Sequence, residues 1–340
     1  MYDETVTVVE NRPLTGGHFL LSVHSPRQAR ATRPGQFAMV RLLGRSDVLL
    51  RRPMSIYDVA PGSAGVPPAP VGGGRRPVAP VSPPAVPAMR TSPLQQAGGH
   101  RPPLQSAIQV GGPLQGRLRP PHQKAEIVQL LYKVVGRGTR LMAELRPGDR
   151  VGMLAPLGHG FFQEEYLDRA READEVLHVA GGIGIAALLL PARELALAGV
   201  RQRLFFGGRT RRDLVGVQDF KPYVSAAVLA TEDGSRGHRG YVTRPLEEYL
   251  ERRREKTFLL MVCGPWAMLQ ASVELAKKFA HPCLVSMENR MGCALGVCLG
   301  CCIRVVGEGH GAYQRVCTEG PVFWAEKVVW SRETGVGRSE

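Results

Sequence analysis

The sequence predicts a β plus α/β chain with an N-terminal antiparallel β-barrel, a doubly wound parallel sheet and a small C-terminal cysteine module. Short apolar runs separated by Pro and Gly fill the first sixty residues, and a strand–helix rhythm extends over 174–285. Five of the seven cysteines then lie between Cys293 and Cys317. A chain of 340 residues is long enough to divide into two or three domains.

The barrel is predicted over residues 1–60 and 126–160. Strands are expected at 5–10, 18–23, 36–41 and 53–59, with Pro and Gly in the breaks between them. The β pattern resumes at 127–135, and a short helix at 140–145 leads through a tight turn to a strand at 151–154. The alternating elements after residue 174 predict strands at 176–180, 204–206, 227–230, 258–262 and 283–288, with helices at 186–198, 245–254 and 266–279.

Residues 61–125 interrupt the barrel with a segment dominated by Pro, Gly, Ala and Arg. The segment has no apolar periodicity, so it cannot bury enough surface to offset its ordering entropy, and we predict disorder. Its flanks read as the two strands of one hairpin. A hairpin tip accepts such an insertion at modest cost because loop-closure entropy grows only logarithmically with length. Residues 327–340 are expected to form a tail.

The formal net charge of +14 would suggest a nucleic-acid partner, but its distribution argues against one. Residues 60–125 hold seven basic residues, no acidic residue and no aromatic ring on which a base could stack. A solvated basic loop explains this charge, so we expect no nucleic-acid partner. The N-terminus lacks the features of a secretory signal, and the most apolar stretch, 176–198, is broken by charges, glycines and a proline. We therefore expect a cytoplasmic protein with no membrane partner.

Four cysteines have the spacing of an iron–sulfur site. Cys293, Cys298 and Cys301 form a C-x4-C-x2-C run, and Cys317 follows after fifteen residues, which is the plant-type ferredoxin pattern. Interleaved glycines allow the loop to approach a cluster closely. The spacing predicts a [2Fe–2S] cluster, whereas a structural zinc site usually has paired C-x2-C knuckles and purely structural cysteines need no spacing. Cys302 follows Cys301 directly, and adjacent residues cannot easily face one cluster, so the spacing selects Cys301.

Short motifs elsewhere are typical of nucleotide binding. RPMS at 52–55 lies between two strands, where an arginine beside a hydroxyl can hold a diphosphate and the edge of a flavin. Gly and Thr at 138–139 precede a short helix. GGIGIA at 181–186 joins a strand to a helix, and CGP at 263–265 ends another strand at the same sheet edge, where ligands bind. Three of these motifs also have an interpretation without a binding function. RPMS could be an exposed Arg-Pro turn, Gly and Thr at 138–139 could simply cap a helix, and GGIGIA could be an ordinary glycine-rich βα turn.

The ordered set RPMS, LYKVVGRGT, APLGHGF, GGIGIA, CGP, SMENRMGC, CLGC and RVCTEGPVF resembles the electron-transfer subunit of the NAD-dependent (class B) dihydroorotate dehydrogenases, within the ferredoxin–NADP reductase superfamily. The resemblance covers nearly the whole chain except 61–125 and the tail. It implies that the barrel binds FAD, that 174–285 binds NAD and that 286–326 is a [2Fe–2S] module. The chain departs from the family pattern in the insertion, at Ala187, where proline is common, and at His159, where asparagine is frequent.

The resemblance also implies which residues bind each group. FAD is expected to contact Arg52, Pro53, Met54, Ser55, Leu131, Tyr132, Lys133, Gly138 and Thr139. The nicotinamide nucleotide is expected at Gly181, Gly182, Gly184, Cys263, Gly264 and Pro265. The cluster ligands would be Cys293, Cys298, Cys301 and Cys317.

Nicotinamide moves two electrons together and an iron–sulfur cluster moves one, and a flavin can do both, which explains three sites in one chain. The resemblance implies an FMN-containing partner subunit, in a heterotetramer, that oxidises dihydroorotate in pyrimidine (UMP) biosynthesis. Electrons would pass from FMN through the cluster and FAD to NAD, and we expect no acid–base catalyst in this chain.

Two alternatives remain. One is the small subunit of an NADPH-dependent ferredoxin or sulfide reductase, although those relatives tend to have aspartate at the position of Cys293. Arg209, Arg211 and Arg212 could bind a 2′-phosphate and so favour NADP, or form a solvated loop. The other alternative is a zinc-stabilised interaction module.

Overall fold

The computed structural model describes residues 1–45, 50–62, 108–109, 124–307 and 312–330. The predicted disordered insertion therefore lies outside the described residues except at its ends and at residues 108–109, and so does the predicted tail from residue 331 onward. Among the helices that are described, none is long and apolar enough to cross a membrane.

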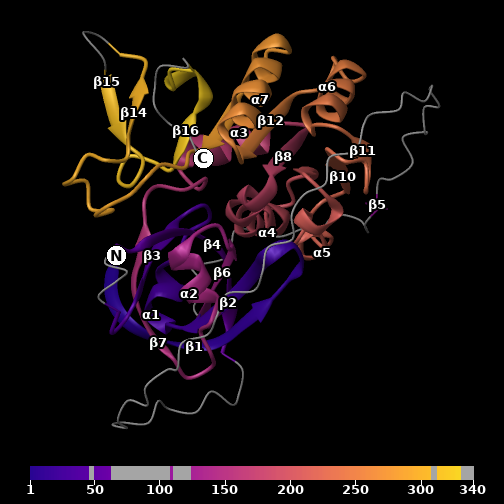
Figure 1. Cartoon of the computed structure of the whole chain (residues 1–340). Coiled ribbons are helices and arrows are strands. Elements are labelled where there is room, and N and C mark those ends of the chain that lie inside the picture. Colours follow the sequence, from indigo (N-terminus) through magenta and orange to yellow (C-terminus); the bar gives the residue numbers. More distant parts are fainter. Residues whose placement is uncertain (46–49, 63–107, 110–123, 308–311, 331–340) are drawn as a thin grey trace, which may run out of the picture. The chain divides into compact units, whose positions relative to one another are not determined.

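A closed antiparallel barrel forms the N-terminal part of the chain (Figure 1). Its strand order is β1-β2-β6-β4-β3-β7. The strands are β1 (Tyr2–Pro13), β2 (His18–His24), β3 (Phe37–Leu42), β4 (Arg52–Pro61), β6 (Ala125–Lys133) and β7 (Arg150–Leu157). Leu21, Ile56 and Met153 are fully buried, because alternate side chains of a barrel strand point into its core.

The insertion joins the ends of two strands that pair with each other. β4 and β6 are antiparallel neighbours and Pro61 lies opposite Ala125, so the hairpin expected from the flanking sequences is present. Residues 108–109 form the short strand β5 (Ile108–Gln109), which pairs antiparallel with β10.

Three short helical segments lie beside the barrel strands. They are η1 (Thr15–Gly17), α1 (Pro26–Ala31) and α2 (Arg137–Ala143). The sequence predicts α2 three residues too late and does not predict α1. The buried side chain of Gln28 on α1 donates to the backbone carbonyls of Tyr2 and Met153, at 2.9 Å each. This single amide thus bridges β1 and β7, which a local sequence pattern does not reveal.

A mainly parallel sheet follows the barrel. Its order is β11-β10-β9-β8-β12-β13-β16, in which the strands from β11 to β13 are parallel and the edge strand β16 is antiparallel to β13; β5 pairs antiparallel with β10 beside this path. The strands are β8 (Glu175–Gly181), β9 (Gln202–Gly208), β10 (Ala226–Thr231), β11 (His238–Arg239), β12 (Phe258–Cys263), β13 (Cys283–Ser286) and β16 (Val322–Trp324). Every residue of β8 and β12 is buried, as expected for central strands covered on both faces.

Helices cover both faces of this sheet. They are α3 (Glu164–Glu172), η2 (Gly182–Ala187), α4 (Leu189–Leu197), η3 (Arg211–Asp213), α5 (Val217–Phe220), α6 (Thr243–Glu251) and α7 (Trp266–Lys278). Val176 of β8 packs in one core with α3, α4 and α5, whereas its neighbour Leu177 packs in the other core with α6 and α7. The predicted fold class, an antiparallel barrel with a doubly wound sheet, is confirmed. The helix expected at 186–198 is instead η2 followed by α4.

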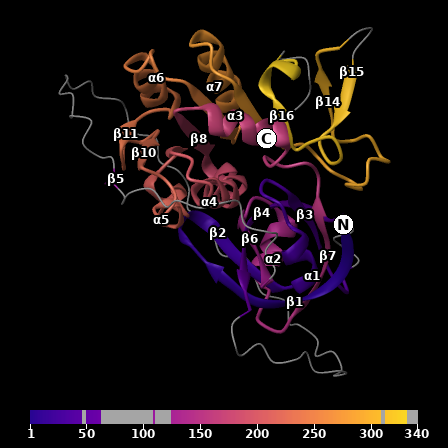
Figure 2. The same ribbon diagram turned by 180° about the vertical axis from the view of Figure 1, so that it is seen from behind.

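The C-terminal module is a two-stranded ribbon, coloured yellow with β16 in Figure 2. It consists of β14 (Cys302–Val305) and β15 (Ala312–Arg315), and the chain then continues to β16 and η4 (Ala325–Lys327). β16 pairs with β13, the strand that precedes the module. The module therefore begins and ends on neighbouring strands of one sheet.

Polar contacts connect the barrel strands β4 and β6 to the parallel-sheet region. Lys133 Nζ lies 2.6 Å from Asp213 Oδ1, and Tyr57 donates its hydroxyl proton to Asp219 at 2.5 Å. Arg193 of α4 pairs with Asp58 of β4. Burial raises the pKa of Asp58 more than this arginine lowers it. This ion pair therefore specifies an orientation more than it adds stability, because its desolvation offsets its attraction.

We predict that His178 makes the fold less stable at mildly acidic pH. This histidine of β8 is fully buried, its Nε2 donates to Gln202 Oε1 at 2.7 Å, and burial lowers its pKa to about 4. The unfolded chain takes up the proton near pH 6.5, before the folded chain does. About 3 kcal/mol of stability is therefore lost as the pH falls from 6.5 toward 4.

Denaturant unfolding at a series of pH values checks this. His178→Gln should reduce the loss of unfolding free energy between pH 6.5 and 4, and His238→Gln, at a partly exposed histidine, should leave it unchanged. An equal pH dependence in all three proteins would contradict the prediction.

Candidate flavin, nucleotide and iron–sulfur sites

A cavity of about 290 Å³ lies among the barrel strands, the turn after β8 and the segment after β13. Its wall contains Arg52, Pro53, Met54, Ser55, Leu131, Tyr132, Lys133 and Thr139, which are eight of the nine residues predicted to contact FAD. Phe37, Val135, Ile183, Ala186, Ser286, Met287, Glu288, Met291 and Pro321 complete the wall. The structure thus brings the predicted flavin residues together with part of the predicted nucleotide turn.

Gly138, the ninth predicted residue, lies directly against Arg52. A Cβ added at Gly138 would come within 2.2 Å of Arg52 Nε and 2.6 Å of Cζ. The guanidinium also donates to the Leu50 carbonyl. The absence of a side chain at residue 138 is therefore what allows the arginine to lie across the start of α2, where it lines the cavity.

Two of the predicted flavin residues already have partners in the protein. The Thr139 hydroxyl accepts from the backbone N–H groups of Val135 and Gly136 at 2.9 and 3.1 Å, so it shapes its own turn. Lys133 is paired with Asp213. Desolvation alone would raise the pKa of Asp213, but hydrogen bonds from Lys133 and Thr210 outweigh it and lower the pKa. The positive charge at the cavity is therefore carried mainly by Arg52.

The two predicted nucleotide motifs pack against each other. A Cβ at Gly184 would lie 2.4 Å from the Cys263 carbonyl oxygen, and a Cβ at Gly181 would lie 2.8 Å from Pro265 Cδ. Gly182, with φ of +52°, has nothing within 4 Å of its Cβ position, so this part of the turn is open to a ligand. The Cys263 thiol is fully buried, and burial raises its pKa, so it lies behind the turn and is a packed thiol.

Ser286 and Glu288 line the cavity although sequence reasoning did not select them. Ser286 ends β13 and Glu288 follows it, and β13 pairs with β12, so both lie at the same sheet edge as the CGP motif. The surrounding protein displaces water and raises the pKa of Glu288, even though this side chain remains accessible from the cavity. The quoted motif SMENRMGC contains both residues and was the only indication in the sequence.

The four predicted cluster cysteines lie together in two pairs. Cys293 interacts with Cys298, and Cys301 interacts with Cys317. Backbone N–H groups of Leu295 and Cys298 donate to Cys293 Sγ at 3.3 and 3.4 Å. These donors lower the pKa of Cys293 to about 6, whereas burial and the Cys301 contact raise the pKa of Cys317 to about 11.

This arrangement suits a two-iron cluster. Each iron of a [2Fe–2S] cluster takes two thiolates beside its bridging sulfides, and N–H groups directed at the sulfurs stabilise the thiolates. In the described part of the chain, no three His, Cys, Asp or Glu side chains are grouped as a single metal ion would require. The donor set, its pairwise geometry and the close glycines fit the predicted group.

Cys301 and Cys302 differ in their surroundings. Cys301 is buried and contacts Cys317, whereas Cys302 begins β14, is partly exposed and lies opposite Arg315. These positions support the prediction that Cys301 is the ligand.

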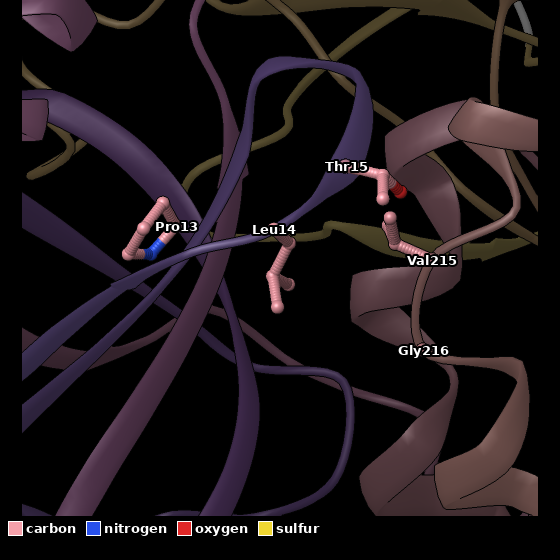
Figure 3. Close-up of a pocket in the computed structure, with 5 residues that line it drawn as sticks. All are labelled: Pro13, Leu14, Thr15, Val215 and Gly216. Carbon is pink, nitrogen blue, oxygen red and sulfur yellow. The ribbon is translucent and has the colours of Figure 1, made fainter.

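A second hollow, of about 480 Å³, lies between η1 and the segment after η3 (Figure 3). Its wall contains Pro13, Leu14, Thr15, Val215 and Gly216. Its wall contains none of the predicted site residues and no titratable side chain. The residues predicted to bind FAD therefore line the first cavity and not this hollow.

The remaining residues singled out in the sequence lie outside this cavity. Arg209, Arg211 and Arg212 follow β9 on the surface. Ala187 is buried at the end of η2, and His159 Nδ1 lies 2.7 Å from the Thr318 carbonyl oxygen.

These features define an electron-transfer flavoprotein of the reductase type that carries an added iron–sulfur domain. A family model described as the iron–sulfur cluster binding domain of dihydroorotate dehydrogenase B matches residues 288–329. The NADH-dependent reduced ferredoxin-NADP oxidoreductase structure has a similar fold, with a TM-score of 0.67 and 24% identity, covering 96% of this chain and 90% of that one.

The electron transfer subunit of dihydroorotate dehydrogenase B (NAD(+)) from Desulforamulus reducens is 30% identical over 312 residues, which are 92% of each chain. The corresponding subunit from Geobacillus thermodenitrificans is 29% identical over 326 residues, 96% of this chain and 98% of that one. The chain belongs to the family of the electron transfer subunits of dihydroorotate dehydrogenase B. The family resemblance and the electron-transfer role expected from the sequence are thereby confirmed.

We predict that Gly138→Ala weakens flavin binding at least about tenfold, because the new methyl group displaces the Arg52 guanidinium. Fluorescence titration of the apoprotein with FAD measures the effect. Gly136→Ala is the matched control, since its Cβ would have no protein atom within 4 Å and its φ is −162°. Equal affinities for Gly138→Ala and the unchanged protein would contradict this.

Proposed function

We propose that this chain transfers electrons from the FMN of a partner subunit, which oxidises dihydroorotate, through a [2Fe–2S] cluster and FAD to NAD. One observation carries the proposal. A single cavity is shared by the barrel strands, by Ile183 and Ala186 of the nucleotide turn, and by Met291, two residues before Cys293. A flavin in this cavity would lie between the nucleotide and the cluster.

The bound groups supply the redox chemistry, since a flavin exchanges electrons both in pairs and singly. The chain's own residues bind and orient. Arg52 is placed to pair with a flavin phosphate or ring edge, supported by Ser55. Gly182 leaves room for the nucleotide backbone, and the N–H groups around Cys293 hold the thiolate. No residue of the chain is assigned as an acid–base catalyst, because dihydroorotate oxidation takes place on the partner.

The partner is proposed to bind at the cysteine loop, in a cytoplasmic heterotetramer. Leu295, Val297 and Leu299 lie between the first three cluster cysteines and are 47, 79 and 60% exposed. A group of neighbouring apolar side chains with this much solvent exposure is typical of a surface that a partner covers. A partner seated there would also bring its own cofactor close to the ligands.

Reconstitution tests the proposed function. The chain mixed with its FMN subunit should form NADH from dihydroorotate and NAD, and neither protein should do so alone. The chain alone should show flavin and iron–sulfur absorption after anaerobic purification. Turnover only with ferredoxin and NADPH would favour the related reductase, and a colourless zinc protein would overturn the proposal.

We predict that Val297→Asp weakens assembly with the FMN subunit at least about tenfold, because a carboxylate would be desolvated in the interface. Analytical ultracentrifugation of the mixed subunits measures assembly. Leu43→Asp, at a 37% exposed leucine on the barrel, is the control and should assemble normally. Unchanged assembly of Val297→Asp would place the partner elsewhere.

A further inference from the structure

The turn that carries Cys317 is organised by one residue at its start. Arg315 ends β15, and its carbonyl accepts from the N–H groups of Thr318, Glu319 and Gly320 at 3.2, 2.9 and 3.3 Å. The next residue, Val316, donates its N–H to the Cys301 carbonyl at 3.1 Å. The backbone around Arg315 therefore fixes the position of Cys317 relative to Cys301.

Glu319 closes the same turn through its side chain. Its carboxylate accepts from the Arg315 backbone N–H at 2.6 Å and from Arg315 Nε at 2.9 and 3.1 Å, and Nη2 donates to it as well. The Thr318 hydroxyl adds a further bond at 3.0 Å. Both carboxylate oxygens and two of the guanidinium nitrogens thus take part in one ion pair.

The third nitrogen of the Arg315 guanidinium reaches across to the cysteine loop. Nη1 donates to the Gly296 carbonyl at 3.1 Å. Gly296 has φ of +77°, and a Cβ there would lie 3.1 Å both from this nitrogen and from Thr318 Cγ2. A glycine is thus required where the arginine crosses, and the ion pair connects the loop 293–301 to the turn 315–319.

The peptide groups on either side of Gly296 face the cysteines. The Gly296 N–H interacts with the thiol of Cys317, and the Val297 N–H interacts with the thiol of Cys293. The Val297 N–H belongs to the same planar peptide unit as the Gly296 carbonyl and points the opposite way. Holding the carbonyl on Arg315 therefore aims this N–H at the Cys293 sulfur.

We propose that the Arg315–Glu319 ion pair is a positioning device that aims these N–H groups at the cluster sulfurs and sets the reduction potential of the cluster. The inference rests on the proposed function, because it requires the [2Fe–2S] cluster at the four cysteines. Reduction adds one negative charge to a cluster that is already anionic. Donors to sulfur and nearby positive charge therefore raise the potential, and nearby negative charge lowers it.

The ion pair has no net charge, so the charge of each side chain offsets the effect of the other on the cluster. Arg315→Gln exposes the Glu319 carboxylate and releases the Gly296 carbonyl, and both changes lower the potential. Glu319→Gln leaves an unpaired guanidinium that interacts with Cys317, which raises the potential. The two side chains are 39 and 31% exposed, so solvent screening limits each shift to at most about tenfold in the ratio of oxidised to reduced cluster, or 59 mV for a one-electron couple.

The test is a redox titration of the purified holoprotein without its partner, followed by the electron paramagnetic resonance signal of the reduced cluster, with iron and sulfide measured in each sample. The potential should fall in Arg315→Gln and rise in Glu319→Gln. Arg304→Gln is the matched control, because it removes the same charge two residues from Cys302 on the same ribbon but makes no described contact with Gly296. Its shift should be less than half that of Arg315→Gln.

Shifts of the same sign in both variants, or unchanged potentials at full iron content, would overturn the proposal. If Arg315→Gln fails to retain iron, Arg315→Lys decides the question. Lysine keeps the positive charge, but its single nitrogen cannot replace the three guanidinium nitrogens that bond Glu319 and Gly296. This variant should retain the cluster and show a smaller fall, and an unchanged potential would count against the ion pair. Lack of iron and sulfide in the unchanged protein would instead overturn the proposed function.

Discussion

The contact of the turn after β8 with the barrel strands β4 and β6 determines where the other parts of the site lie. Gly181 and Gly184 allow this turn to pack against the end of β12, and Ile183 and Ala186 then face the barrel across the cavity. The polar contacts of Lys133 and Tyr57 hold the same arrangement. Small residues set the distance and charged residues set the orientation, so the cavity has a defined width before any ligand is bound.

The cluster ligands depend on the same sheet. β13 carries the chain from the nucleotide edge to the cysteine loop, and β16 brings it back beside β13. Within the loop, the pairing of Cys293 with Cys298 and of Cys301 with Cys317 follows from backbone hydrogen bonds and not from the spacing alone. Thiolate ligands need N–H donors as well as the right intervals.

Much of this could be predicted from the sequence because the informative patterns were local. Period-two and strand–helix patterns gave the barrel and the parallel sheet, and cysteine spacing predicted a group that the structure assembles. Features made by distant segments were not predictable in this way. Ser286 and Glu288 reach the cavity only through strand pairing, Lys133 is occupied by Asp213 from a later helix, and Gln28 bridges strands far from it in sequence. A one-dimensional pattern contains no information about such partners.

The return of the chain to β16 has a consequence for how this architecture can change. Ser286 of β13 lies opposite Val322 of β16, so everything between them is an excursion from one strand to its immediate neighbour. The segment between β13 and β16 therefore behaves as an insertion, because a tight reverse turn could join these two antiparallel strands without altering the order of the sheet. A lineage could therefore gain or lose the one-electron site with the sheet order unchanged, and the flavin cavity would then change its wall at Met287, Glu288, Met291 and Pro321.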